Sequence, residues 1–162
     1  MKLLKRKFSK ILVAMDGSES SKDAARYATM MAKKNNSDLI AIHVLTPDGY
    51  AYLFDIPPSD AGSLEELLNI SKHVVMNWID EIKEEEQTNN DGNKNMDELR
   101  LKTEVILATK PIVGEIVDYA ERENIDLIVI DSRGRTGLKK MLLGSVASGV
   151  VTYASCPVLV VK

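Results

Sequence analysis

Apolar residues in this chain alternate between short continuous runs and longer stretches of helical spacing. A nearly continuous apolar run, bounded by turn or polar residues, is typical of a strand buried on both faces of a sheet. Such runs occur at Ile11–Met15, Asp38–Leu45, Asp126–Ile130 and Val158–Val161. A further segment, Leu101–Leu107, alternates between apolar and polar residues, as a half-buried strand does.

Helical spacing of apolar residues fills the intervals between these runs. Ser20–Asp23 resembles a capping box ahead of one helix, and Ser63–Glu66 resembles a second. Pro111 suits the first turn of a third helix, and Gly144 with Ser145 opens a fourth. The apolar faces of the first three helices are Ala24, Tyr27, Ala28, Met31 and Ala32; Leu64, Leu67, Leu68, Val74, Val75, Trp78, Ile79 and Ile82; and Val113, Ile116, Val117 and Ala120.

Strands that alternate with helices predict an α/β fold in which five parallel strands form one sheet with helices on both faces. We expect right-handed crossovers and a single domain over residues 1–162. Ligands of such sheets bind beyond the carboxyl ends of the strands. Asp16, Val44 and Asp131 lie at or just past the ends of three strands, so we expect the sheet to bring them together.

Two long segments show neither pattern. Thr46–Gly62 carries prolines, glycines and aromatic residues and is long enough to be a functional loop. Gln87–Glu98 is polar and contains glycine, which predicts a surface loop within the same domain.

The segment Ser132–Leu143 connects the run ending at Ile130 to Gly144 and Ser145. It contains two glycines and four cations: Gly134, Gly137, Arg133, Arg135, Lys139 and Lys140. Glycines allow close approach of the backbone to a ligand, and the first amides of a helix favour an anion. The segment therefore predicts a phosphate site, although turn glycines and a solvated basic face would give the same composition. Ser145 can cap the helix, donate to a phosphate oxygen, or do both.

The composition is that of an ordinary globular protein, with 44% apolar and 28% charged residues. A net charge of −3 argues against a nucleic acid or an anionic membrane as the partner. The one cysteine, Cys156, excludes an internal disulfide and suits a reducing compartment, so we expect a cytoplasmic protein. His43 and His73 lack metal-ligand spacing with Cys156, so no protein metal site is expected.

The end of the chain resembles the universal stress protein family. That family's nucleotide loop has glycine, two residues, glycine, nine residues, glycine and then Ser or Thr, and Gly134 and Gly144-Ser145 match its second and third glycines. The closing run Ala154–Val161 also resembles the family's last strand, and the resemblance extends from Lys10 to Lys162. Asp131 departs from the pattern because it occupies the place of the first glycine.

The resemblance implies a Rossmann-like fold, similar to adenine nucleotide alpha hydrolases, that binds ATP or a related adenine nucleotide. It places Asp16 at the ribose hydroxyls, Ala14 and Met15 beside the base, and the backbone of Val44 opposite the adenine. The expected nucleotide-binding residues are Ala14, Met15, Asp16, Val44, Asp131, Arg133, Gly134, Gly144, Ser145 and Val146. It also implies a homodimer formed through Val158, Leu159, Val160 and Val161, and an apolar edge strand is physically a pairing surface.

Asp131 leaves three arrangements open. A carboxylate ~5 Å from a phosphate would cost about 3 kcal/mol at an effective dielectric constant near 20. Arg133 or Arg135 could offset this cost, a Mg²⁺ ion shared with the phosphates could turn it into coordination, or the carboxylate could point away.

We therefore predict an adenine-nucleotide-binding protein that acts in stress response or signalling as a homodimer. The alternative is an interaction module of the same fold in which Asp131 has removed nucleotide binding. An ATPase or phosphotransferase ranks last, since the sequence offers no placed general base and hydrolysis would be slow at most.

Overall fold

The computed structural model describes residues 7–46, 63–89, 99–133 and 143–162. Most of the two predicted long loops therefore lies outside the described residues. The same holds for residues 134–142 of the predicted phosphate loop, which include Gly134, Arg135, Gly137, Lys139 and Lys140.

The strands form one parallel sheet. They are β1 (Lys10–Ala14), β2 (Asp38–Leu45), β3 (Leu101–Leu107), β4 (Leu127–Asp131) and β5 (Val158–Val161). Their order across the sheet is β3-β2-β1-β4-β5, and every neighbouring pair is parallel. This confirms the predicted five-stranded α/β fold. The chain adds β2 and β3 on one side of β1 and then β4 and β5 on the other, so the switch in strand order lies between β1 and β4.

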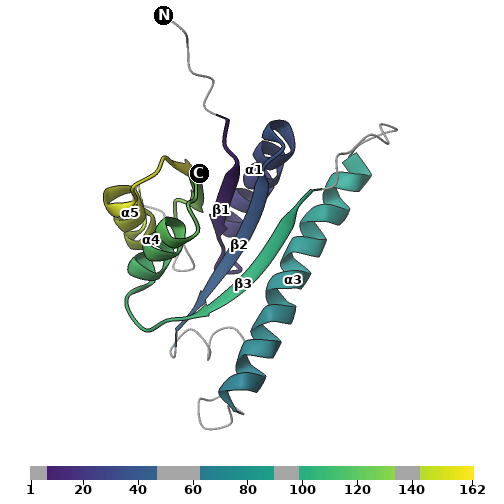
Figure 1. Cartoon of the computed structure of the whole chain (residues 1–162). Coiled ribbons are helices and arrows are strands. Elements are labelled where there is room, and N and C mark those ends of the chain that lie inside the picture. Colours follow the sequence, from purple (N-terminus) through teal and green to yellow (C-terminus); the bar gives the residue numbers. More distant parts are fainter. Residues whose placement is uncertain (1–6, 47–62, 90–98, 134–142) are drawn as a thin grey trace, which may run out of the picture.

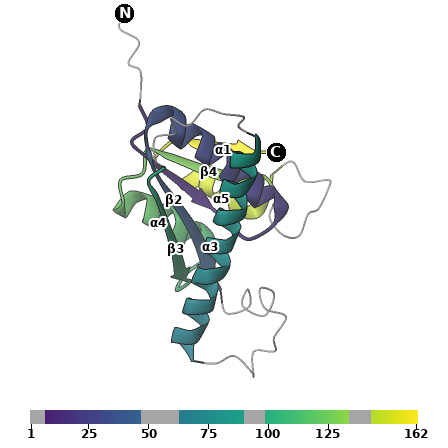
Figure 2. The ribbon, with the colours of Figure 1, turned by 90° about the vertical axis from the view of Figure 1, so that its right-hand side faces the viewer.

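Helices cover both faces of the sheet (Figure 1). They are α1 (Glu19–Asn35), α3 (Leu64–Asn89), α4 (Ile112–Arg122) and α5 (Ser145–Tyr153). Ala24, Ala28 and Ile79 of α1 and α3 pack with Ile11 and Val13 of β1 on one face. The opposite face is covered by α4 and α5, whose contacts include Ile116 and Val150 packed with Leu12 and Ile128. In Figure 2, α3 crosses in front of the strands. Because both faces of β1 and β4 are covered, consecutive residues of these strands are buried, which explains their runs of apolar residues.

One predicted helix start differs from the one observed. Helix α1 begins at Glu19 and is capped by Ser18, whose Oγ accepts from the Ser21 amide, so the capping box predicted at Ser20 is wrong by two residues. The predicted opening of α5 at Gly144 and Ser145 is confirmed; Gly144 is the cap and Ser145 is the first helical residue. The box predicted at Ser63 is confirmed, because Ser63 and Glu66 exchange side-chain-to-backbone hydrogen bonds in both directions.

The predicted apolar stripe of α3 reaches the core only from Val75 onward. Val75, Ile79 and Ile82 are in the core, whereas Leu64 in the first turn is 51% exposed. Figure 1 shows the reason: the first turns of α3 project past the carboxyl ends of the strands, so no strand lies beneath them. Neither α3 nor any other helix in the described ranges is long and apolar enough to span a membrane.

Glu115 ties the turn between β3 and α4 together. Its Oε1 accepts from the Thr109 amide at 2.7 Å, the Thr109 hydroxyl at 3.0 Å and the Lys110 amide at 3.2 Å. These hydrogen bonds, that of the Thr109 amide foremost, lower the pKa of Glu115 below its ordinary value of 4.5.

We expect Glu115→Gln to lower the free energy of unfolding at neutral pH by up to about 1 kcal/mol, since the carboxylate is partly screened by solvent. A lowered folded pKa stabilises the protein above the unfolded pKa, and this gain is lost as the pH falls through the folded value. Wild type and variant should therefore converge in acid during urea unfolding followed from about pH 7 to about pH 3. Glu121→Gln, at an exposed position on the same helix, is the matched control. A difference that stays constant over this range would contradict the role of the Glu115 charge.

Candidate functional site

The carboxyl edge of the sheet brings most of the predicted site residues together. Val13 of β1 is in register with Val129 of β4, so Met15 and Asp131, each two residues further along, lie at the same level on either side of the switch point. The Met15 amide donates to the Ile42 carbonyl at 2.9 Å, which continues the pairing of Ala14 and holds the start of the loop against β2.

Asp16 organises the loop between β1 and α1. Its Oδ1 accepts from the Ser18 amide at 2.9 Å and from the Ser18 hydroxyl at 2.6 Å. The hydroxyl of Ser18 also caps α1, so one serine connects Asp16 to the start of the helix. Asp16 is half-buried, which leaves its carboxylate within reach of a ligand at the edge of the sheet.

Asp131 is the last residue of β4 and its carboxylate is directed toward α1. Oδ2 accepts from the Ser20 hydroxyl at 2.9 Å and from the Arg133 amide at 3.2 Å. Asp131 is only 7% exposed, although its partner Ser20 is separated from it by 111 residues in sequence. Ser20 is in the first turn of α1, where unpaired amides and the helix dipole favour a negative charge.

Gly144 places the start of α5 against the end of β4. Its amide donates to the Ser132 carbonyl at 2.7 Å, and a Cβ there would lie 3.2 Å from the Arg133 carbonyl oxygen. Glycine permits this close approach of two backbones. Exposed Ser145 and half-buried Val146 follow, so the first amides of α5 lie near the switch point. Gly134, also predicted for this site, lies outside the described residues.

A tryptophan and a histidine support the Asp16 loop from behind. Gly17 has φ of +85°, and a Cβ there would lie 2.6 Å from Cη2 of Trp78 on α3. Trp78 meets the buried His43 ring edge-on, with ring centroids 5.6 Å apart. Nδ1 of His43 lies 2.7 Å from the Met15 carbonyl oxygen, a distance that fits an N–H donated to the backbone on the other side of Asp16.

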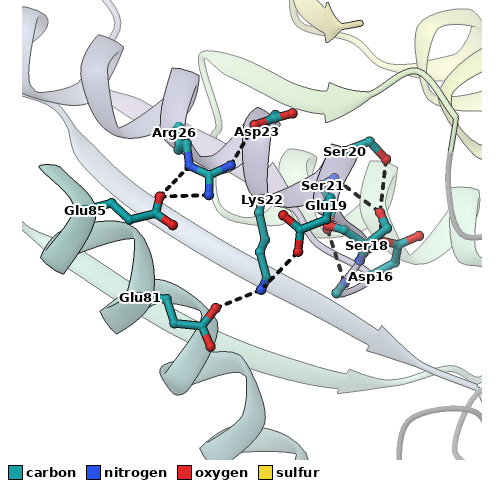
Figure 3. A network of polar contacts seen from close by, with 11 residues as sticks. Asp16, Ser18, Glu19, Ser20, Ser21, Lys22, Asp23, Arg26, Glu81 and Glu85 are labelled. Atoms are coloured by element: carbon teal, nitrogen blue, oxygen red, sulfur yellow. Dashed lines mark hydrogen bonds and ion pairs between the residues drawn. The ribbon is translucent and has the colours of Figure 1, made fainter.

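Ion pairs join α3, and with it Trp78, to the first turns of α1 (Figure 3). Lys22 lies between Glu81 at 2.7 Å and Glu19 at 3.4 Å, and the hydrogen bond to Glu81 raises the pKa of Lys22. One turn later, Arg26 bonds Glu85 at 2.7 Å and Asp23 at 2.6 Å. The spacing of four residues on both helices makes these two bridges parallel.

Four residues of this site are not predicted from the sequence: Ser18, Ser20, His43 and Trp78. Three serines within four positions after β1 were a signal for hydroxyl donors at this edge, but the sequence does not show which of them faces β4. The contributions of His43 and Trp78 depend on how β2 and α3 pack against the loop, which no local pattern encodes.

A cavity of about 340 Å³ lies at the opposite edge of the sheet, around Lys10, Arg100, Lys102 and the amino ends of β2 and β3. Its cations are already partnered: Arg100 with Asp38, Lys102 with Glu104, and Lys10 with the Glu123 carbonyl. The carboxyl edge is therefore the better candidate for an anionic ligand.

Among the described residues, no three His, Cys, Asp or Glu side chains are grouped so that they could hold a metal ion. A divalent cation at this edge would accordingly depend on ligand oxygens for part of its coordination. Burial raises the pKa of the Cys156 thiol, which disfavours the reactive thiolate.

The comparison with protein families agrees with this architecture. The family model described as "Universal stress protein family" matches residues 7–162. The chain belongs to the universal stress protein family. Universal stress protein MJ0531 of Methanocaldococcus jannaschii is 35% identical over 155 residues, which covers 96% of this chain and 82% of that protein.

Solved structures of universal stress proteins share the fold. The structure of MJ0577 from Methanocaldococcus jannaschii is 28% identical, covers 96% of each chain and has a TM-score of 0.69. A universal stress protein in complex with cAMP is 20% identical, covers 96% of this chain and 98% of its own, and has a TM-score of 0.64. One from Archaeoglobus fulgidus in complex with dAMP is 20% identical, covers 96% and 99%, and has a TM-score of 0.56.

Proposed function

We propose that this protein binds an adenine nucleotide at the carboxyl edge of its sheet and acts in stress response or signalling as a cytoplasmic homodimer. The contact that carries the proposal joins the Gly144 amide to the Ser132 carbonyl, because it brings the start of α5 to the end of β4, next to the switch point. Two universal stress proteins of the same fold are described in complex with cAMP and dAMP, which supports an adenine ligand at the level of the fold.

The roles of the residues follow from their chemistry. A carboxylate accepts hydrogen bonds only, so Asp16 suits the ribose hydroxyls, while Ala14, Met15 and the backbone of Val44 would line the base. The Ser145 hydroxyl, Val146 and the cation of Arg133 would meet the phosphate, together with Gly134 and Gly144. ATP, with or without Mg²⁺, is one ligand of this class, and its phosphates would supply the metal ligands that the described side chains do not.

One observation favours a second candidate, an interaction module that binds no nucleotide. The hydrogen bond from Ser20 to Asp131 crosses the switch point, so a carboxylate already lies where a phosphate-bearing ligand would enter. In this alternative the protein would act through its dimer surface or through the segment Thr46–Gly62.

Ligand released from the purified, denatured protein separates the two candidates. We expect mass spectrometry to find an adenine-containing compound, and titration of the ligand-free protein to restore binding. Asp16→Ala should reduce the affinity for that compound about tenfold or more, since it removes a charged acceptor of ligand hydroxyls. Exposed Asp80 on α3 provides a matched control through Asp80→Ala. No released compound and no binding on titration would support the interaction module.

A further inference from the structure

The Ser20–Asp131 hydrogen bond spans the switch point, where ligands of doubly wound sheets bind. Ser20 comes from the helix that follows β1, and Asp131 ends β4, so the bond joins the two sides of the switch point. Its length of 2.9 Å and the near-complete burial of Asp131 make it a regular part of the fold and not a surface contact.

Two described donors to Asp131 are of the kind that hold a phosphate oxygen elsewhere. One is a serine hydroxyl in the first turn of a helix, and the other is the backbone amide of Arg133 in the loop leading to α5. Both converge on the single oxygen Oδ2. The chain thus supplies an anion of its own to donors that a ligand phosphate could otherwise use.

We propose that Asp131 makes the site selective for adenine ligands of low negative charge, the nucleoside or a monophosphate, over the diphosphate and triphosphate. This inference rests on the proposed nucleotide-binding function. An ionised Asp131 repels each further phosphate and keeps two donors from it, while the adenine and ribose contacts on the β1 side are unaffected. By Coulomb's law in a partly screened site, each added phosphate near Asp131 should weaken binding by about tenfold.

Calorimetry with a ligand series tests the selectivity. The series is adenosine, cyclic AMP, AMP, ADP and ATP, measured first with EDTA present so that no divalent cation intervenes. For the wild type, we expect affinity to fall as ligand charge rises. In Asp131→Asn, which keeps the size of the side chain and loses its charge, the affinity for ATP should rise about tenfold to a hundredfold, whereas that for adenosine should stay within about twofold.

A second variant and a control test whether the loss of the Asp131 charge causes the change in ATP affinity. Asp131→Gly restores the residue that the family loop has at this position and should show the same gain for ATP. Asp23→Asn removes an exposed carboxylate from the same part of α1 and should leave the order of affinities unchanged, since solvent screens it. Circular dichroism and urea unfolding confirm that each variant is folded.

The possible results test the charge selectivity separately from the proposed adenine binding on which it rests. If the wild type binds adenosine but binds ATP equally well, and Asp131→Asn changes neither, the proposed selectivity is wrong while the adenine site stands. If added Mg²⁺ tightens ATP binding in the wild type and Asp131→Asn abolishes that gain, Asp131 is a metal ligand and the inference is overturned. If no protein binds even adenosine, the proposed function fails and the selectivity fails with it.

Discussion

Replacing Gly17 with alanine is expected to lower the free energy of unfolding by about 2–5 kcal/mol. Two costs add at this position. The backbone has φ of +85°, a conformation that a residue with a Cβ adopts only under strain. The new methyl group would also overlap the Trp78 ring, whose Cη2 would be 2.6 Å away. Urea unfolding at a fixed protein concentration measures the total.

The two costs can be separated by changing the ring. In a Trp78→Leu background the overlap is relieved but the backbone strain remains, so Gly17→Ala should then cost only about 1–2 kcal/mol. Gly114→Ala is the matched control. Gly114 lies within α4, where a Cβ would meet only the flexible Lys110 side chain at 3.3 Å, and alanine should be neutral or stabilising there by up to about 1 kcal/mol. Equal losses for the Gly17 and Gly114 variants would refute the account.

The Gly17 substitution should also weaken adenine binding if the proposed function holds. Asp16 immediately precedes Gly17, and His43 and Trp78 fix the backbone on either side of it. Any shift that makes room for the methyl group moves the Asp16 carboxylate relative to the ribose. Adenosine affinity, measured below the unfolding transition, reports this displacement separately from stability.

The sheet could be predicted because its strands are encoded locally. Three strands, Asp38–Leu45, Leu101–Leu107 and Val158–Val161, have the bounds that the apolar pattern indicated, and the other two are displaced by one residue. A strand buried on both faces must be apolar throughout, so its ends coincide with the first turn or polar residues. The stripe of α3 was predicted too long because helical spacing says nothing about where the supporting sheet ends.

The site was predictable in position but not in its contacts. Parallel strands necessarily bring their carboxyl ends to one edge, which located Asp16 and Asp131. Which serine caps α1 depended on tertiary structure: Ser18 is held by Asp16, and this leaves the hydroxyl of Ser20 for Asp131. None of the three arrangements considered for Asp131 names its observed partner on α1, the hydroxyl of Ser20, which lies more than a hundred residues away in sequence.

The open edge of β5 is the surface through which the proposed homodimer would form. Val160→Pro is expected to weaken dimerisation at least about thirtyfold. Carbonyl groups of Pro157 and Val161 accept from β4, so by the alternation of a strand the backbone groups of Val158 and Val160 face the open edge of the sheet. Proline at 160 removes an N–H from that edge without breaking the pairing to β4. In a two-fold symmetric dimer the loss occurs twice, and two hydrogen bonds at about 1 kcal/mol each amount to about thirtyfold.

A charge placed on the Val160 side chain would be a less specific test. Val160 packs against the core on the α5 face, so Val160→Lys would disturb that core as well as the edge. Val160→Thr is the matched control for proline, since it retains both the N–H and the β-branched shape and should remain dimeric.

Sedimentation equilibrium over a range of micromolar concentrations distinguishes the possibilities. We expect dimer for the wild type and Val160→Thr, and monomer for Val160→Pro with circular dichroism close to that of the wild type. Exposed Tyr153 on α5, with 70% of its surface accessible, offers a contrast. If Tyr153→Ser dissociates the dimer and Val160→Pro does not, the subunits meet through the helix and not through paired strands. A monomeric wild type at these concentrations would exclude the dimer altogether, and the adenine site would then have to act within a single subunit.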